Sequence, residues 1–428
     1  MKILIMNGRV LDPANNFDAQ ANIFVDSGKI VSVKTGAVGD YAKTADEIID
    51  AAGLWVVPGL IDMHVHLRDP GQLHKETIAT GTRAAAAGGF CTVCCMPNTS
   101  PVIHSAEVVN YIREQAAWDG AVRVLVVGSI TKDLAGVELS ALEDMKEAGI
   151  VAISDDGKTV ENVELFTRGL VLAQRLNLPV LSHCEPEEEI IARDIELARE
   201  TGARLHICHV STAVGVELIR EAQKSGQNVT AEVAPHHFVL VADDIPLREN
   251  AEAINLPVDG HTNLATNLPM DNHANLDTNY KMAPPLRSVD DRVAILDALK
   301  DGTISAIATD HAPHHATEKA LPYESAANGI IGLETAVPLA ITELVNTNIL
   351  TPLELIAKFT VNPAKILNLP HLGSLAVGGV ADITLIDPIA RYIIDRENFQ
   401  GLSKNTPFHG RAVTGRVVQI ICNGKIHQ

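Results

Sequence analysis

Eight short apolar segments recur between residues 54 and 308, and a helix-like stretch follows most of them. The segments are apolar on both faces, which is typical of strands in a parallel sheet covered by helices. The eight segments are residues 54–63, 90–96, 122–127, 150–153, 179–181, 205–208, 228–233 and 305–308. The helix-like stretches include residues 76–87, 106–118, 160–176, 190–200, 214–224 and 290–300. This α/β alternation predicts a closed (β/α)8 barrel of the TIM type rather than a doubly wound sheet.

The two ends of the chain carry short strand-like pieces with turn signals between them. Asn7-Gly8 and Ser27-Gly28 mark turns near the start, and Asn423-Gly424 marks one near the end. We therefore expect a small composite β-sandwich domain built from residues 1–53 plus 372–428, beside a catalytic barrel domain of residues 54–371. Residues 244–279 are rich in asparagine and show no periodicity, which predicts a long surface loop.

Charge and cysteine content narrow the class of function. The chain has 34 Lys and Arg against 53 Asp and Glu, a net charge of −19, which argues against non-specific binding to nucleic acid or to an anionic membrane. No apolar run approaches the ~18 residues of a membrane span. Six cysteines are too few for a disulfide scaffold of this length and suit a reducing compartment. We expect a cytoplasmic protein that acts on a small molecule.

Potential metal ligands follow the predicted strands at their carboxyl ends, where parallel barrels build their active sites. His64 and His66 are two positions apart on the first strand. Because side chains alternate along a strand, both point to the same face. The later strand ends supply Asp156, His183, His209 and Asp310. One such histidine is usually a packed residue, but several that converge are best satisfied by divalent cations. More than four candidates indicate two metal ions, with Zn²⁺ the best match and Mn²⁺, Fe²⁺ or Co²⁺ as substitutes.

The ordered set of motifs resembles the metal-dependent cyclic amidohydrolases, and most closely the type I dihydroorotases of bacteria. The motifs include Asp62-Met-His64-Val-His66-Leu-Arg68, Met96-Pro-Asn98-Thr99, Ser154-Asp-Asp156-Gly157, Ser182-His183-Cys184-Glu185, His209-Val-Ser-Thr212, Pro284-Pro-Leu-Arg287 and Thr309-Asp310-His-Ala-Pro-His314. The resemblance covers nearly the whole chain.

The resemblance implies a role for each matching residue. His64, His66 and Asp310 would hold one zinc ion, His183 and His209 would hold a second, and Asp156 would bridge them. In hydantoinases and allantoinases a carboxylated lysine makes that bridge, so an aspartate there favours a dihydroorotase. Such an enzyme interconverts N-carbamoyl-L-aspartate and L-dihydroorotate in de novo pyrimidine (UMP) biosynthesis. Asp310 would also move the proton between the attacking hydroxide and the ring nitrogen.

The same resemblance implies a substrate pocket. Its predicted residues are His66, Arg68, Asn98, His314, Asn328 and Gly329. Arg68 would separate dihydroorotate from neutral cyclic amides, because its guanidinium group matches a free carboxylate. Other strand-end histidines, namely His206, His236, His237 and His311, are expected to be structural or to support the ligands.

Three departures from the family pattern bear on the expected substrate contacts, oligomer contacts and turnover rate. Ala283 stands where the family has asparagine, and Asn328 stands where it has phenylalanine before the glycine. The stretch 185–191 is shorter than expected, and the loop 244–279 is longer.

Two alternative functions stay open at this point. One is a hydantoinase, dihydropyrimidinase or allantoinase, and the other is a non-catalytic scaffold that binds a partner such as aspartate transcarbamoylase. The sequence leaves open a homo-oligomer and an association with that transcarbamoylase.

Overall fold

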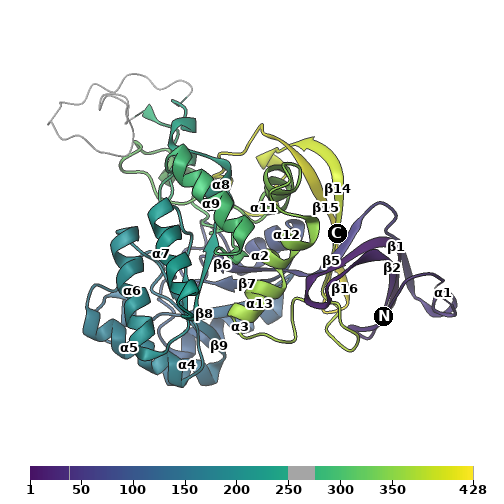
Figure 1. The fold of residues 1–428 in the computed structure, drawn as a ribbon, viewed down its shortest axis with the longest axis horizontal. Helices are drawn as coiled ribbons and strands as arrows, with labels where there is room; N and C mark the ends of the chain where they lie inside the picture. Colours follow the sequence, from purple (N-terminus) through teal and green to yellow (C-terminus); the bar gives the residue numbers. More distant parts are fainter. Residues whose placement is uncertain (38, 249–274, 428) are drawn as a thin grey trace.

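The computed structural model describes residues 1–37, 39–248 and 275–427, so most of the predicted loop 244–279 lies outside the described residues. Two separate sheets organise the described chain (Figure 1). One has the parallel strand order β13-β12-β11-β10-β9-β8-β7-β6. Its strands are β6 (Leu60–Val65), β7 (Phe90–Cys95), β8 (Arg123–Gly128), β9 (Ile150–Ile153), β10 (Val180–Ser182), β11 (Leu205–Ile207), β12 (Val229–Val233) and β13 (Ala306–Ile307).

Contacts between the first and last of these strands nearly close the sheet into a barrel. Val65 forms a parallel bridge with His311, and the His66 amide donates to the His311 carbonyl at 2.8 Å. The carboxylate of Asp62 accepts the amide of Thr309 at 3.1 Å across the same seam. The predicted TIM-type barrel is therefore confirmed, and its seam lies beside two of the predicted metal-ligand motifs.

Helices surround the barrel, and polar caps begin several of them (Figure 1). Asn162 accepts the Leu165 amide, and Thr212 accepts the Gly215 amide, each capping a helix whose apolar face is buried. The helices are α1 (Tyr41–Thr44), α2 (Ile78–Ala87), α3 (Ala106–Asp119), α4 (Leu142–Ala148), α5 (Val163–Arg175), α6 (Glu187–Thr201), α7 (Ala213–Lys224), α8 (Pro235–Val239), α9 (Val289–Asp301), α10 (Ala316–Lys319), α11 (Ala336–Ala340), α12 (Pro352–Phe359) and α13 (Val361–Ile366). Single turns also occur at Pro13–Asn15, Lys132–Leu134, Ala242–Asp244, Thr278–Tyr280, Ile341–Val345 and Arg396–Asn398.

The second sheet is mixed and combines both ends of the chain, as the turn signals predicted. Its order is β16-β15-β14-β5-β1-β2-β3, with β4 pairing β1 in parallel. The strands are β1 (Lys2–Asp12), β2 (Phe17–Asp26), β3 (Lys29–Lys34), β4 (Glu47–Asp50), β5 (Trp55–Pro58), β14 (Ile383–Ile393), β15 (Ala412–Cys422) and β16 (Lys425–His427). Both termini lie on this side of the molecule (Figure 1).

The apolar run 54–63 is two strands rather than one. Strand β5 belongs to the mixed sheet, where it pairs with β1 and β14, and β6 begins the barrel after Gly59. A Cβ atom on Gly59 would lie 2.7 Å from Cys91 Cβ and 2.8 Å from Asp382 Cβ, so only glycine fits where the two sheets meet. The domain boundary between residues 53 and 54 stays a prediction.

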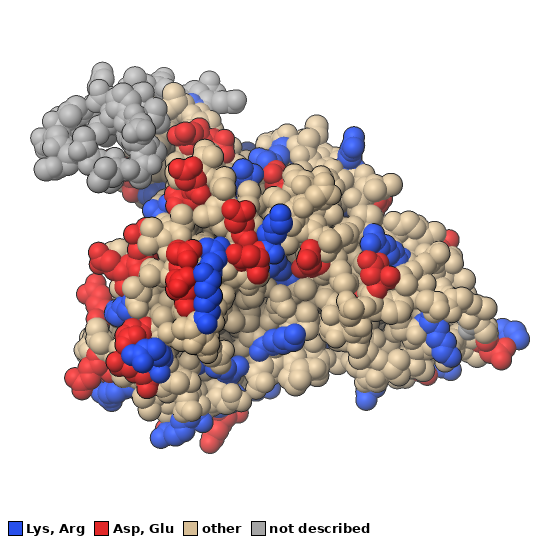
Figure 2. Space-filling view, in the orientation of Figure 1, with Lys and Arg blue, Asp and Glu red and all other residues tan. Residues whose placement is uncertain are grey.

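Charged side chains of both signs cover the barrel helices on the face in Figure 2. Asp and Glu side chains are frequent over α5, α6 and α7, with Lys and Arg among them. Within the described residues, none of the helices is both long enough and apolar enough to cross a membrane.

Candidate metal centre

Barrel strand ends bring the six predicted metal ligands together. His64 lies in β6 and His66 follows it directly, while the other four residues follow β9, β10, β11 and β13 by one to three positions. Those four are Asp156, His183, His209 and Asp310. All six are buried. The carboxyl end of a parallel barrel thus collects side chains that are far apart in sequence.

The first group of donors comprises His64, His66, Asp156 and Asp310. Nε2 of His66 lies 3.1 Å from Oδ1 of Asp310 and 3.5 Å from Oδ2 of Asp156. Nε2 of His64 lies 3.2 Å from Oδ1 of Asp156 and 3.5 Å from Oδ1 of Asp310. Two imidazole nitrogens and two carboxylates therefore converge on one point.

The second group shares Asp156 with the first. Oδ1 of Asp156 lies 3.6 Å from Nδ1 of His183 and 3.6 Å from Nε2 of His209, and the two imidazole nitrogens are 3.0 Å apart. The ligand atoms of Asp156, His183 and His209 all lie within 4.8 Å of one another, as do those of His64, His66 and Asp156. Asp156 is thus the one residue common to both groups.

The donor atoms fit divalent cations. Nε2 of His64 and Oδ1 of Asp156 are buried without a hydrogen-bond partner, although they face each other. Burial opposes ionisation of Asp156, but the imidazoles of His64, His183 and His209 outweigh it and hold the pKa of the carboxyl well below its usual range. Burial is likewise outweighed at Asp310, whose pKa the facing histidines lower. Imidazole nitrogens and ionised carboxylates are the ligands that Zn²⁺, Mn²⁺, Fe²⁺ and Co²⁺ accept.

Glu232 contacts a histidine of this cluster, and the sequence analysis did not predict it. Its Oε1 lies 2.7 Å from Nδ1 of His64, and its Oε2 lies 3.2 Å from Nε2 of His206. Burial disfavours the carboxylate, but His206 and His64 hold the pKa of Glu232 at about 2. An acidic residue inside the short, buried strand β12 was the signal that could have identified it, because a buried charge requires a partner.

Two further aspartates fix the backbone beneath the ligands. Asp62 is fully buried and accepts the amides of His64 and Thr309, each at 3.1 Å. Asp155 accepts the amides of Ile130 and Thr131 at 2.7 and 2.9 Å. Asp156 and Asp310 therefore follow anchored segments rather than free loops.

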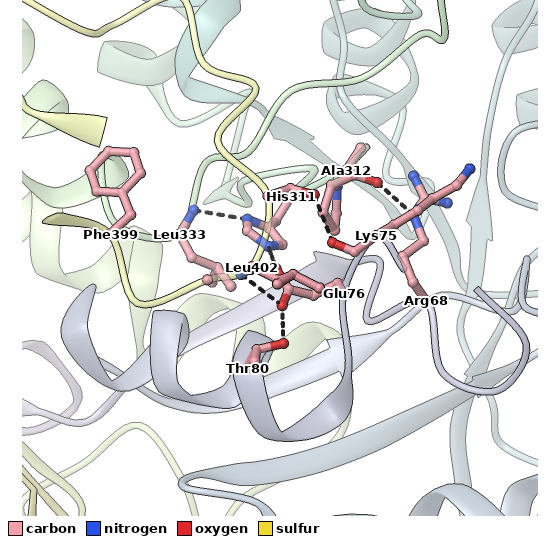
Figure 3. Close-up of polar contacts among 12 residues, drawn as sticks. Arg68, Lys75, Glu76, Thr80, His311, Ala312, Leu333, Phe399 and Leu402 are labelled. Carbon is pink, nitrogen blue, oxygen red and sulfur yellow. Dashed lines mark hydrogen bonds and ion pairs between the residues drawn. The ribbon is translucent and has the colours of Figure 1, made fainter. Parts of the chain in front are cut away.

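A buried polar cluster around His311 and Glu76 joins the barrel to the loop between β14 and β15 (Figure 3). Nδ1 of His311 accepts the Gly332 amide at 3.2 Å, and its Nε2 lies 3.8 Å from Oε2 of Glu76. Oε1 of Glu76 accepts the amide of Leu402 at 3.1 Å. His311 thus pairs with Glu76, which is not one of the six predicted ligands, and Glu76 in turn holds the loop between β14 and β15; support of a metal ligand by His311 stays a prediction.

A cavity of about 210 Å³ opens over the ligand cluster. Besides five of the ligands, its lining includes the predicted substrate residues Arg68, Asn98, His314, Asn328 and Gly329. Ala283 lines it as well, at the position where the family pattern has asparagine. All six predicted substrate residues therefore line one cavity. The sixth, His66, is also one of the predicted metal ligands.

Arg68 and His314 form one end of this cavity. Arg68 Nε donates to the Pro313 carbonyl at 3.1 Å, and its Nη2 lies 3.3 Å from Nε2 of His314. Burial lowers the pKa of Arg68 to about 10, which leaves the guanidinium charged at neutral pH. Burial and the neighbouring Arg68 lower the pKa of His314 to about 3, so its imidazole is neutral.

The histidines that were expected to be structural are also buried. His206 lies against Glu232 and 2.8 Å from Thr230 Oγ1. His236 and His237 belong to α8, and Nε2 of His237 lies 3.2 Å from the Pro284 carbonyl. Burial lowers the pKa of His237 to about 3, so it packs as a neutral side chain.

Comparison with known proteins places these features in context. A model of the amidohydrolase family matches residues 55–427. The dihydroorotase of Pelotomaculum thermopropionicum is 44% identical over 100% of this chain and 98% of that protein. The dihydroorotase of Syntrophotalea carbinolica is 45% identical over 100% and 99%.

Solved structures share the fold. An L-hydantoinase (dihydropyrimidinase) from Arthrobacter aurescens superposes with a TM-score of 0.83 at 25% identity, over 99% of this chain and 95% of that one. A dihydropyrimidinase from Brevibacillus agri gives 0.82 at 23% identity, over 100% and 95%. These likenesses agree with a barrel beside a separate sheet.

Proposed function

The chain belongs to the amidohydrolase family, and from this premise we propose that it is a dihydroorotase, which interconverts N-carbamoyl-L-aspartate and L-dihydroorotate in pyrimidine biosynthesis. The observation that carries the proposal is the likeness to proteins named dihydroorotase at 44 and 45% identity along the whole chain. The buried cation of Arg68 beside the metal-ligand cluster supports it, because the substrate carries a free carboxylate.

Two zinc ions are the proposed cofactors. His64, His66 and Asp310 would hold one ion, His183 and His209 the other, and Asp156 would bridge both. The support is the pair of three-residue groups that share Asp156, together with the unpartnered atoms that face each other within them. Bound at this place, the cations would polarise the ring carbonyl and supply a nucleophile near neutral pH.

Asp310 is the proposed catalytic residue. It lines the cavity, and the facing histidines lower its pKa, so the carboxylate is ionised and carries no proton before the reaction. In ring opening it would take the proton of the attacking water and give it to the leaving ring nitrogen. In ring closure the same carboxylate would remove that nitrogen's proton as the C–N bond forms and would return it to the departing oxygen, which leaves as water.

The substrate carboxylate is proposed to bind at the end of the cavity formed by Arg68 and His314. Asn98 lines the same cavity, and its Oδ1 lies 2.8 Å from Nδ1 of His66 while its Nδ2 donates to Asp156 at 3.4 Å. It therefore contacts two of the proposed metal ligands directly. Asn328 and Gly329, which line the same cavity next to His314, would also contact the substrate.

A hydantoinase, dihydropyrimidinase or allantoinase is the alternative enzyme, and the solved structures that share the fold bear two of these names. A neutral ring would leave Arg68 without a matching anion in a buried pocket. The scaffold hypothesis has less support, because all six predicted ligands come together.

The deciding experiment compares ring opening of L-dihydroorotate with that of hydantoin, dihydrouracil and allantoin. We expect dihydroorotate to be the preferred substrate. Asp310→Asn should lower its kcat by about 10²- to 10⁴-fold, the usual size of a general acid–base contribution. The variant's metal content must be measured alongside, since Asp310 is also a proposed ligand. Preference for a neutral ring would overturn the proposal.

Three wider features belong to the same proposal. We infer a composite domain of residues 1–53 plus 372–428 and a catalytic domain of residues 54–371, whose first strand β5 adds to the second sheet. We also infer that the protein acts in the cytoplasm. A homo-oligomer, and an association with aspartate transcarbamoylase, would be tested by size-exclusion chromatography of the protein alone and mixed with that enzyme.

A further inference from the structure

One wall of the cavity consists of irregular backbone. Helix α10 ends at Lys319, and residues 320–329 form turns and loops before the bridge at Ile330. Asn328 and Gly329 from this segment line the cavity. Because no regular hydrogen-bond ladder holds these residues, other groups must fix their position.

The ammonium group of Lys319 makes the central contacts with this segment. Its Nζ donates to the carbonyls of Lys281, Ala327 and Gly329 at 3.1, 2.9 and 3.0 Å. The side chain is 6% exposed. An ammonium group has three N–H donors, and here each of them has a backbone acceptor. Two of these acceptors bracket Asn328.

Two other side chains complete this support. Nζ of Lys281 donates to the carbonyls of Glu324 and Ala326, both at 2.8 Å. Asn405, from the loop between β14 and β15, donates to the carbonyls of Gly329 and Ala312 at 3.0 Å and accepts the His314 amide at 3.1 Å. Lys319 is the member of this set that contacts both residues next to Asn328.

The same segment touches the proposed carboxylate end of the cavity. Nε2 of His314 lies 2.8 Å from the Asn328 carbonyl, and it also lies beside Arg68. A displacement of residues 327–329 would therefore move the Asn328 carbonyl away from His314. It would also change the cavity wall at Gly329.

We propose that Lys319 is a positioning residue, whose ammonium group holds residues 327–329 in the geometry that binds an anionic substrate. The identity of that substrate rests on the proposed dihydroorotase function, but the positioning of the segment does not. Lys319 lies outside the cavity over the metal ligands, so it acts through the backbone that it holds.

The charge of this lysine is sensitive to pH near neutrality. Burial, aided by Lys281 and Arg248 and opposed by Asp277, lowers the pKa of Lys319 to about 7. His314 and Lys404 share a neighbouring cavity of about 540 Å³ with it. A neutral amine has only two N–H donors, so above this pH one of the three carbonyls loses its partner. Substrate affinity should therefore fall as the pH rises above about 7.

The test compares the wild-type protein with Lys319→Met and a matched control, Lys358→Met. Lys358 is also buried, with a pKa that burial lowers to about 8, but its Nζ donates to the Ile304 carbonyl, before strand β13 begins, and thus away from the carboxyl ends. KM and kcat for L-dihydroorotate are measured from pH 6 to 9, together with metal content. Hydrogen exchange of the peptide containing residues 320–330 gives a readout that requires no substrate.

We expect Lys319→Met to raise KM by about tenfold at pH 6.5, with unchanged metal content and kcat within about threefold. Its KM should be flat from pH 6 to 8.5, whereas the wild-type KM rises toward it. Exchange of the 320–330 peptide should accelerate in this variant. Lys358→Met should keep the wild-type KM profile even if it unfolds at a lower temperature.

An unchanged KM and unchanged exchange in Lys319→Met would overturn the proposal. If that variant fails to fold, the wild-type protein still decides. Its exchange in the 320–330 peptide, corrected for the intrinsic effect of pH, must increase between pH 6 and 8, and no increase overturns the proposal. Failure of the proposed function would look different, because the wild-type protein would then not open dihydroorotate while the exchange result still stood.

Discussion

Oε1 of Glu232 lies 2.7 Å from Nδ1 of His64, while Nε2 of the same imidazole lies 3.2 Å from Oδ1 of Asp156. Glu232 therefore accepts a hydrogen bond from Nδ1–H and leaves Nε2 free to bind a cation. Strand β12 supplies none of the predicted ligands, yet through Glu232 it sets the tautomer and orientation of one of them.

Replacing Glu232 with glutamine should weaken metal binding. The amide keeps the volume but removes the charge that orients His64, and loss of such a partner typically costs 10- to 100-fold in metal affinity or activity. Competition with a chelator of known affinity measures the effect. Asp382→Asn is a matched control, because Asp382 is also buried but pairs with Arg123 rather than with a ligand. Equal metal affinity in Glu232→Gln and wild type would contradict the orienting role.

Removing the guanidinium of Arg68 should alter substrate preference. Hydrogen bonds to charged groups contribute about 1.5–3 kcal/mol, so Arg68→Ala should lower kcat/KM for dihydroorotate by about 10- to 150-fold. Hydantoin has no carboxylate, and its slower hydrolysis should change by less than about threefold. Arg68→Lys keeps the positive charge but lacks the planar guanidinium fork. Its kcat/KM for dihydroorotate should therefore lie between those of the wild type and Arg68→Ala. A parallel loss for both substrates would mean that Arg68 is structural.

Much of the barrel, and the place where the six proposed ligands converge, could be predicted from the sequence for one reason. In a parallel barrel every strand ends at the same rim, so a polar residue after an apolar run has a known place before any tertiary contact is known. Residues 150–153 form β9 with the predicted bounds, and Asp156 follows it at the rim. His64 and His66 required only the alternation of side chains along a strand.

Features that depend on contacts between distant segments could not be predicted in this way. The change of sheet at Gly59 lies inside an apolar run, and the close approach of Cys91 and Asp382 that requires glycine there depends on the folded structure. The same holds for Lys319, because its sequence neighbours give no sign that its ammonium group contacts backbone at residues 281, 327 and 329. Periodicity reports which face of an element is buried, but not what that face meets.

Glu334 should make the stability of the protein depend on pH. Burial raises the pKa of Glu334 to about 7, although the amides of Gln400 and Gly401 donate to its carboxyl at 2.8 and 3.1 Å. Between about pH 4.5 and 7 the folded state therefore keeps a proton that the unfolded state has released. The free energy of unfolding contributed by this group consequently falls as the pH rises through that window.

Urea unfolding of wild type and Glu334→Gln at pH 5, 6, 7 and 8 measures this contribution. The stability of the wild type relative to the variant should fall by up to about 3 kcal/mol across the window, at about 1.4 kcal/mol per pKa unit. Glu354→Gln is a control that should show no change in this window. Glu354 accepts the Thr351 amide at 2.7 Å, a contact that lowers the pKa of its carboxyl, so its contribution is lost only at more acidic pH and the difference between wild type and Glu354→Gln should stay constant from pH 5 to 8. A pH-independent difference for Glu334→Gln would contradict the assignment.

Metal removal is the most direct test of the ligand cluster. Without cations, Nε2 of His64 and Oδ1 of Asp156 are buried with no hydrogen-bond partner, so binding of metal should both restore activity and raise the unfolding temperature. We expect chelator-treated protein to be inactive and Zn²⁺ to restore ring opening, with saturation at two equivalents per chain because Asp156 belongs to both donor groups. Mg²⁺ should restore much less, since it prefers oxygen ligands and four of the six donors are imidazoles. Saturation at one equivalent would contradict the bridging role of Asp156, and full activity in the metal-free protein would contradict the metal-dependent mechanism itself.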